Sequence, residues 1–390
     1  VSTGILSILS ISCTVLIILL LTRYYWLTSV LGLNTIYMLP FIVMLVSIPA
    51  GSSLSYFAIM TRFERKSVKY SIGTILQLIV QISISIYGVV VLQAGIVSIF
   101  AGILLGEFTG IIYFGYINRN NIGFIFEWKY LKRALLFSIP TLPAILAGWI
   151  DSSMGQILIG KYVSQTQLGI YSVALQFASV FTLVSVALNN VWGPYLYENY
   201  KHENFNKDIK VLYTFILIVL IVISINISLL SEELIILFSN NTYVEASKYL
   251  TLLCIPMSIY LLFPIANSGI SISRDTKYTG IAYVVGSIIN ILALYVLLSR
   301  LEVIAVPISL ALSRITTYMI LYKISKLKNI IVLPNQFLFI LIFSVIACYI
   351  FLHLDFNIIV RLCILIIIDC SILYYFVNRI GQLSDIIKRK

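Results

Sequence analysis

The sequence predicts an all-α polytopic membrane protein with about twelve transmembrane helices. Of its 390 residues, 60% are hydrophobic and only 11% are charged, and the mean hydropathy is +1.03. A soluble domain of ordinary composition has about 25% charged residues. The hydrophobic residues fall into runs of about 17–25 residues, the length that a helix needs to cross a bilayer. A membrane β-barrel would instead show alternating segments of roughly ten residues.

Each predicted helix is an apolar run bounded by basic, polar or aromatic residues. The first run is not followed by a small-residue cleavage site, so it is predicted to be a span and not a cleaved signal. A basic stretch at 62–69 and a tight turn near Gln93 separate the next three spans, and a second basic stretch at 129–133 precedes the fifth. The predicted spans are 5–21, 37–57, 72–91, 96–116, 134–160, 168–191, 212–230, 249–270, 278–298, 303–322, 337–352 and 358–376.

The distribution of basic residues gives an independent test of this number of spans. Lysine and arginine favour cytoplasmic loops. If the loops are assigned to alternate sides, one side holds twenty of these residues, and the other holds only Arg23, Lys161, Lys248 and Arg300. A wrong number of spans would mix the two sets. We therefore expect both chain termini in the cytoplasm.

The net charge of +11 does not indicate nucleic-acid binding, because the basic residues lie in short loops between apolar runs. No loop exceeds about twenty residues, so no soluble catalytic domain is expected. The segment 155–161 (GQILIGK) imitates a phosphate-binding loop, but Tyr162 follows where Ser or Thr would hold magnesium. The five cysteines and two histidines lack the spacing of a zinc site. We expect neither an enzyme nor a bound cofactor or metal.

Three glycines in the fourth span recur at every fourth position: Gly102, Gly106 and Gly110. They therefore share one helix face, where small side chains let two helix backbones approach closely. A packing seam is the plain interpretation, and a mobile gating seam is the alternative.

Charged residues inside predicted spans are the main candidates for function. Glu107, Asp151 and Arg314 lie well inside apolar runs, where an ionised side chain costs about 2.5–3.5 kcal/mol even on the lenient insertion scale. Such residues usually face a charged partner or a water-filled cavity, and both interpretations stay open for these three. Arg361 and Asp369 lie on the last span, eight residues apart on one face, and are predicted to form structural ion pairs.

Prolines interrupt several of the predicted spans. A proline removes a backbone hydrogen bond and bends its helix, and transporters use such broken helices near their substrates. These residues are Pro40, Pro49, Pro140, Pro143, Pro256, Pro264 and Pro307. Proline is also common in membrane helices generally, so these residues support transport only moderately.

A more specific pattern begins at the fifth span. A helix start with Pro140, the turn 159–162 (IGKY), the segment 169–174 (GIYSVA) and a long helix ending near Pro194 follow one another. This order resembles the polysaccharide transporters of the MOP (MATE-like) superfamily, the Wzx-type O-antigen flippases. The polar turn 273–277 (SRDTK) adds a second match. The resemblance extends from about residue 35 and is strongest between 130 and 330.

The chain departs from this family's pattern in two ways. The family commonly has an aspartate followed by a basic residue before the IGKY-like turn, where this chain has Gly155 and Gln156, with Asp151 one turn earlier. The family also has six helices before the proline-containing span, where four are predicted here. We therefore expect an N-terminal lobe at 1–133 that lacks two spans and a C-terminal lobe with two terminal spans at 134–390. A divergent first lobe is the alternative.

The resemblance implies two lobes in a V around a central cavity that opens alternately to each side of the membrane. The implied substrate is an oligosaccharide repeat of O-antigen or capsule type on undecaprenyl pyrophosphate, moved from the cytoplasmic to the outer leaflet. Arg314 is the first candidate cation for the pyrophosphate and Lys161 the second. Glu107 and Asp151 are expected to pair with them or to take up a proton or sodium ion. Membrane lipids, a polysaccharide polymerase and a chain-length regulator are the implied partners.

Three other functions compete with this one, and the sequence disfavours the last two. A multidrug or small-molecule cation antiporter of the same superfamily would need an acidic residue that controls cation exchange. A membrane-embedded sugar polymerase or acyltransferase would need a large polar loop outside the membrane. A scaffold without transport would not need buried charges or kinked helices.

Overall fold

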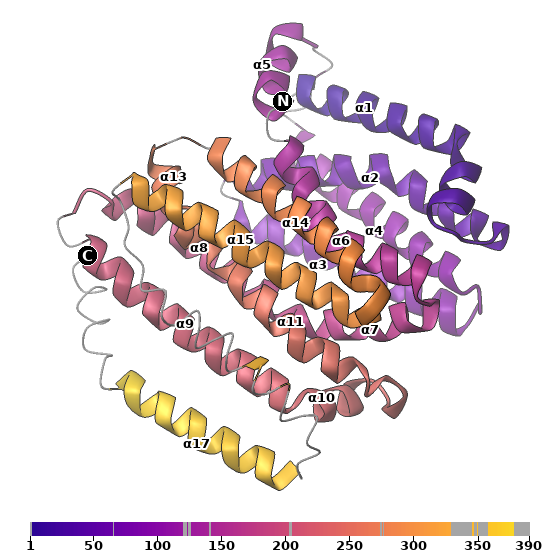
Figure 1. Cartoon of the computed structure of the whole chain (residues 1–390). Coiled ribbons are helices and arrows are strands. Elements are labelled where there is room, and N and C mark those ends of the chain that lie inside the picture. Colours follow the sequence, from indigo (N-terminus) through magenta and orange to yellow (C-terminus); the bar gives the residue numbers. More distant parts are fainter. Residues whose placement is uncertain are drawn as a thin grey trace. The chain divides into compact units, whose positions relative to one another are not determined.

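The computed structural model describes residues 2–64, 66–119, 123, 126–139, 142–202, 205–273, 275, 277–328, 345–346, 349 and 358–377. In these residues every regular element is a helix (Figure 1). Nine helical stretches there are long and apolar enough to cross a membrane. The prediction of an all-helical polytopic membrane protein is confirmed.

The chain divides into two compact units, Val1–Pro140 and Thr141–Lys390. In the first unit, α1 (Ser2–Leu21), α2 (Met38–Phe63), α3 (Ser67–Val90) and α4 (Ile96–Ile117) each have the length of a membrane span. Both α2 and α3 pack against α4, and α1 packs against α2. A π-helical turn, Tyr25–Val30, and a short 3-10 turn, Thr35–Tyr37, connect α1 to α2.

The glycine seam of α4 lies against its two neighbours in this unit. A Cβ atom at Gly102 would lie 2.7 Å from the carbonyl oxygen of Gln81 on α3, and one at Gly106 would lie 3.1 Å from that of Gln77. A Cβ atom at Gly110 would instead meet the side chain of Leu54 on α2, at 2.5 Å. The three glycines are buried, as the packing interpretation requires.

The short helix α5 (Trp128–Ser138) differs from the predicted spans. The sequence analysis expected one span at 134–160, but the structure has α5 and then a separate helix α6 (Leu142–Tyr162). Residues 128–133 (WKYLKR) carry three positive charges, and only eleven residues are helical, so α5 is too short and too polar to span. The span of this region is α6 alone.

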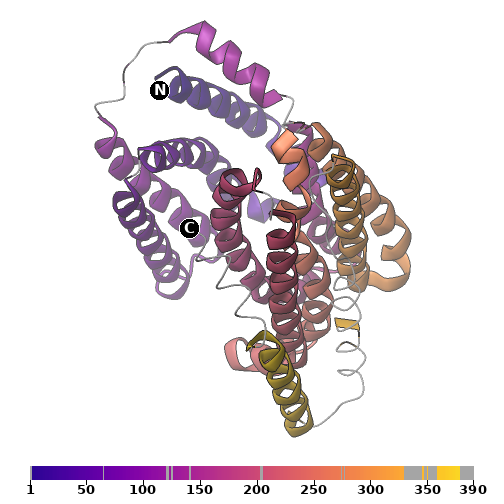
Figure 2. The ribbon, with the colours of Figure 1, turned by 90° about the vertical axis from the view of Figure 1, so that its left-hand side faces the viewer.

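The second unit contains the remaining helices, which run roughly along one common direction in both views (Figures 1 and 2). After α6 come α7 (Gln165–Ala178), α8 (Val180–Asn199), α9 (Phe205–Leu229) and the short α10 (Ser231–Phe238). A broken helix then follows as α11 (Ala246–Leu261), α12 (Phe263–Ala266) and α13 (Ser268–Ser273). The unit ends with α14 (Lys277–Leu301), α15 (Ala305–Leu327) and α17 (Ile358–Val377). The predicted span 337–352 lies almost entirely outside the described residues.

The broken helix forms the centre of the second unit. Its apolar window is 78% buried, whereas the corresponding window of α3 in the first unit is only 11% buried. Pro256 lies inside α11, and Pro264 begins α12. Two serine hydroxyl groups bond to backbone carbonyls of the broken segment. Ser268 Oγ donates to the carbonyl oxygen of Pro264 at 3.0 Å, and Ser325 Oγ on α15 donates to that of Ala266 at 2.5 Å. Side chains therefore satisfy part of the backbone at the break.

Candidate substrate site

A buried ion pair connects two helices of the second unit. Asp151 lies on α6 and Arg314 on α15, and each is only 9% exposed. Asp151 Oδ2 is 3.0 Å from Arg314 Nε. The sequence analysis left ion pairing and cavity roles open for these residues, and the structure brings the two together.

The other carboxylate oxygen of Asp151 has two neutral donors. Asn290 Nδ2 on α14 donates to Asp151 Oδ1 at 2.9 Å, and Ser313 Oγ on α15 donates to the same oxygen at 2.7 Å. Asp151 is therefore fully satisfied although it lies inside a membrane span. Each oxygen of this buried carboxylate has a donor or a positive charge beside it, which offsets the cost of burying the group.

Two glycines bring the three helices of this cluster close together. A Cβ atom at Gly155 would lie 2.2 Å from Val306 Cγ1 on α15, and Gly155 follows Asp151 by one helical turn. A Cβ atom at Gly286 would lie 2.0 Å from Thr317 Oγ1, and Gly286 precedes Asn290 by one turn. Any larger residue at either position would push α6 or α14 away from α15. The two glycines therefore let α6 and α14 pack closely against α15 within one turn of Asp151 and Asn290.

Aromatic rings of the broken helix cover the guanidinium group. Arg314 Cζ lies 4.3 Å from the ring centre of Tyr260 and 5.7 Å from that of Phe263. The two rings meet edge to face with their centres 5.3 Å apart. A guanidinium over an aromatic face is attracted by the ring quadrupole, most strongly where water is excluded. The break between α11 and α12 thus places both rings on Arg314.

A cavity of about 260 Å³ opens beside the ion pair. Asp151, Arg314 and Asn290 contribute to its wall, together with Gln156 and Tyr171. Within the described part of the chain, the terminal Nη groups of Arg314 donate no hydrogen bond, and only Nε is recorded next to a carboxylate. Those N–H groups can therefore bind an anionic group that enters the cavity.

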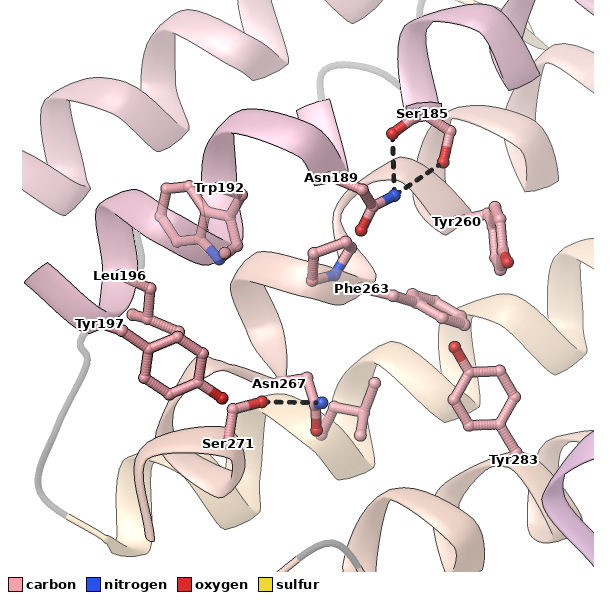
Figure 3. Close-up of a pocket in the computed structure, with 13 residues that line it drawn as sticks. Ser185, Asn189, Trp192, Leu196, Tyr197, Tyr260, Phe263, Asn267, Ser271 and Tyr283 are labelled. Atoms are coloured by element: carbon pink, nitrogen blue, oxygen red, sulfur yellow. Dashed lines mark hydrogen bonds between the residues drawn. The ribbon is translucent and has the colours of Figure 1, made fainter. Parts of the chain in front are cut away.

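A second cavity, of about 300 Å³, is lined by the same aromatic rings (Figure 3). Tyr260 and Phe263 contribute to it, as do Trp192 and Tyr197 on α8 and Tyr283 on α14. The sequence analysis did not identify this cavity. Its lining comes from helices that are far apart in the sequence. The only sequence signal for this region was the pair of prolines in 249–270, which predicted a bent helix.

Glu107 lies in the first unit, on α4. Its carboxylate packs against α2, since a Cβ atom at Gly51 would lie 2.7 Å from Glu107 Oε1. The other oxygen, Oε2, is buried and has no hydrogen-bond partner in the described residues. Asp151 and Glu107 are thus opposite cases, because the first carboxylate is fully compensated and the second is not.

The other predicted site residues lie away from the Arg314 cluster. Lys161 follows Asp151 by ten residues on α6, about 15 Å along the helix axis, and its ammonium lies over the ring of Tyr162 at 5.6 Å. The structure does not pair Arg361 with Asp369.

The charged residues of α17 instead contact α9 and α10. Arg361 Nη1 donates to Glu232 Oε2 at 2.8 Å and to Glu233 Oε1 at 3.4 Å. Asp369 accepts from Asn226 Nδ2 on α9 at 3.1 Å. Both residues therefore hold helices together, but with partners that the sequence analysis did not foresee, because eight residues along one helix are too far apart for direct contact.

Comparisons with known proteins agree with this fold. A family model described as "Polysaccharide biosynthesis protein" matches residues 2–199, just over half of the chain. A structure of the lipid II flippase MurJ in an inward closed conformation superposes with a TM-score of 0.73 at 17% identity, over 97% of this chain and 84% of that chain. A crystal structure of a MATE mutant superposes with a TM-score of 0.59 at 12% identity, over 82% of this chain and 76% of that chain. No protein with a curated description matches the sequence.

Proposed function

Because this chain belongs to the family of polysaccharide biosynthesis proteins, we propose that it moves a lipid-linked sugar across the membrane. The fold that it shares with a lipid II flippase supports a role as a transporter and not as an enzyme. The cargo is an oligosaccharide repeat of O-antigen or capsule type on undecaprenyl pyrophosphate. The protein acts in the bacterial inner membrane, where it delivers the repeat to the outer leaflet for a polymerase and its chain-length regulator.

The single observation that carries this proposal is the state of Arg314. Its charge is balanced by Asp151 and its guanidinium lies over the ring of Tyr260, while within the described residues its Nη groups have no hydrogen-bond partner at the wall of a cavity. A guanidinium held in this way suits a phosphate oxygen, because two N–H groups can meet two oxygens. In this proposal Arg314 binds the pyrophosphate, and Lys161 is too far along α6 to share that contact.

The two predicted coupling residues take different roles in the proposal. Asp151 positions Arg314, because its two oxygens are already occupied and offer no place for a coupling ion. Glu107 is the proton site of the cycle, because its buried Oε2 atom has no hydrogen-bond partner among the described residues and is open to a proton. Binding and release of that proton on opposite sides of the membrane would drive the cycle.

A genetic experiment tests the pyrophosphate contact. The gene is deleted in its source, and plasmids restore the wild-type protein, Arg314→Gln or the control Arg300→Gln, which alters an exposed arginine at the end of α14. Deletion should abolish surface polysaccharide and trap lipid-linked repeats at the cytoplasmic face. Wild type and Arg300→Gln should restore export, whereas Arg314→Gln should not, at equal amounts of protein in the membrane. Full export with Arg314→Gln would refute the assigned role.

The same strains distinguish transport of a glycan from cation antiport. A multidrug antiporter requires a carboxylate that a cation can reach. Asp151 is paired with Arg314, so Glu107 is the carboxylate that such an antiporter would use. Unchanged surface glycan in the deletion strain, together with increased sensitivity to cationic drugs, would replace the flippase by the antiporter.

A further inference from the structure

The second cavity, beside Trp192, has a lining without any charged side chain. Thirteen residues contribute to it, and all of them are neutral. Aromatic rings of Trp192, Tyr197, Tyr260 and Tyr283 alternate with amide and hydroxyl groups (Figure 3). Small-molecule sites combine aromatic surface with a few polar groups in this way. The composition indicates a neutral ligand that has both C–H faces and hydroxyl groups.

Several polar groups of this cavity have hydrogen-bonding capacity to spare. No hydrogen bond is recorded within the described residues for the hydroxyl groups of Tyr197, Tyr260 and Tyr283. Asn189 uses its Nδ2 group on Ser185, one turn earlier on its own helix, and its Oδ1 atom accepts no hydrogen bond there. A purely apolar occupant such as a lipid tail would leave these groups unpaired, which costs free energy.

The floor of the cavity is fixed by hydrogen bonds of its own. Asn267 donates to Ser271 Oγ at 3.2 Å and accepts from Thr279 Oγ1 at 2.7 Å. Trp192 Nε1 donates to Ser268 Oγ at 3.0 Å. These bonds join α8 and α14 to the broken helix, so the aromatic surface is held in place before any ligand enters. Such preorganisation lowers the entropic cost of binding.

The cavity shares two aromatic residues with the surroundings of Arg314, the residue proposed to bind phosphate. Tyr260 and Phe263 line the cavity and also lie against the guanidinium of Arg314. A ligand with an anionic group at Arg314 would therefore have its next segment directly beside these rings. In a lipid-linked glycan, the group that follows the pyrophosphate is a sugar.

We propose that the cavity between α8, the broken helix and α14 binds one neutral sugar ring of the transported glycan, which rests on the function proposed above. The ring lies with a C–H face on the aromatic surface, and its hydroxyl groups bond to Asn189 Oδ1 and to the tyrosine hydroxyls. A volume of about 300 Å³ is at the lower end of the range for small-molecule sites, which suits one sugar ring and not a whole repeat. The remaining sugars lie outside this pocket.

Saturation-transfer NMR on the purified full chain in nanodiscs tests the sugar site. The probes are the methyl glycosides of glucose, galactose and N-acetylglucosamine, a charged glucuronate glycoside, and inorganic pyrophosphate followed by its phosphorus signal. The test variant is Asn189→Ala/Tyr197→Ala, which removes two exposed groups of the cavity. The matched control is Tyr295→Ala on α14, where the tyrosine is 85% exposed and does not line the cavity.

At least one neutral glycoside should bind to wild type, with the strongest saturation on the protons of one ring face. The double variant should weaken this binding about tenfold, the effect of losing about 1.4 kcal/mol, while Tyr295→Ala should not. Pyrophosphate binding by the double variant would show that it is folded.

Equal sugar binding by wild type and the double variant would overturn the inference, as would stronger binding of glucuronate than of every neutral glycoside. A wild-type protein that binds pyrophosphate but no neutral glycoside would overturn the sugar site and leave the proposed function standing. A protein that binds a neutral glycoside at this site but no pyrophosphate would support the sugar site and refute the role of Arg314.

Discussion

At the scale of single residues, the chain carries two buried carboxylates with opposite surroundings. Asp151 has an arginine and two neutral donors, whereas Glu107 has one buried oxygen with no donor among the described residues. Placing an ionised group inside a membrane is costly unless it is paired. The contrast therefore separates a carboxylate that is paired within the fold from one that lacks a partner for one oxygen among the described residues.

The ion pair predicts a large and asymmetric effect on stability. Asp151→Asn leaves the positive charge of Arg314 buried without a counterion, which should lower the free energy of unfolding by about 3–5 kcal/mol. The double variant Asp151→Asn/Arg314→Gln removes both charges and should regain much of that loss. Denaturant unfolding of the detergent-purified proteins measures both effects. If the double variant were as unstable as the sum of the two single variants, the pair would not be coupled.

Glu107 gives a prediction about coupling that does not depend on stability. Glu107→Gln keeps the shape of the neutral side chain, so the variant should unfold like wild type. It cannot release a proton, so transport in proteoliposomes should no longer respond to a pH gradient. Wild type in the same vesicles, with and without the gradient, is the control. A variant that still follows the gradient would exclude Glu107 as the proton site.

At the scale of elements, glycines on α4 set the spacing of the first unit. Gly102→Ala places a Cβ atom 2.7 Å from a backbone oxygen of α3, and backbone cannot move aside as a flexible side chain can. Overpacking of this kind should destabilise the protein by about 1–3 kcal/mol.

Gly115 on the same helix is the matched control, because nothing lies within 4 Å of a Cβ atom there. Gly115→Ala should be neutral or should stabilise the helix by about 0.5–1 kcal/mol, since alanine is the better helix former. Thermal unfolding in one detergent compares the two variants. Equal melting temperatures would contradict the assignment of a packing seam.

The individual helices also show which features the sequence could predict. The apolar run of α4 was predicted to within one residue of its observed end, because run length and hydropathy depend only on neighbouring residues. Pro256 and Pro264 predicted a bend in the span 249–270, but not that the helix breaks at Leu262 and Asn267. The partners of Asp151 on α14 and α15 were equally out of reach, since Asn290 and Ser313 lie more than a hundred residues away. The charge of Asp151 in an apolar run indicated that the residue needs a partner. The partner itself is identified only by the folded structure, in which α6, α14 and α15 pack closely at Gly155 and Gly286.

At the scale of the whole molecule, the bias of twenty basic residues against four makes a prediction about sidedness. The loop before α3 should face the cytoplasm, and the turn between α3 and α4 should face the outside. Lys69 in the first turn of α3 and Ala94 in the turn after α3 are exposed positions close to these two places. Because α3 lies between them and has the length of one span, the two positions should be on opposite sides.

Labelling of introduced cysteines tests this orientation directly. The five native cysteines are first replaced by serine or alanine, and Lys69→Cys or Ala94→Cys is then introduced singly. A membrane-impermeant maleimide added to spheroplasts should label Ala94→Cys, and it should label Lys69→Cys only after the membrane is permeabilised.

Tyr162→Cys, on the exposed end of α6 next to Lys161, should behave like Ala94→Cys, because α4 and α6 are the two spans between these positions. If Ala94→Cys and Tyr162→Cys were labelled from opposite sides, α5 would also cross the membrane. If the labelling pattern of all three positions were reversed, the basic loops would lie outside, which would contradict the predicted orientation of the whole chain.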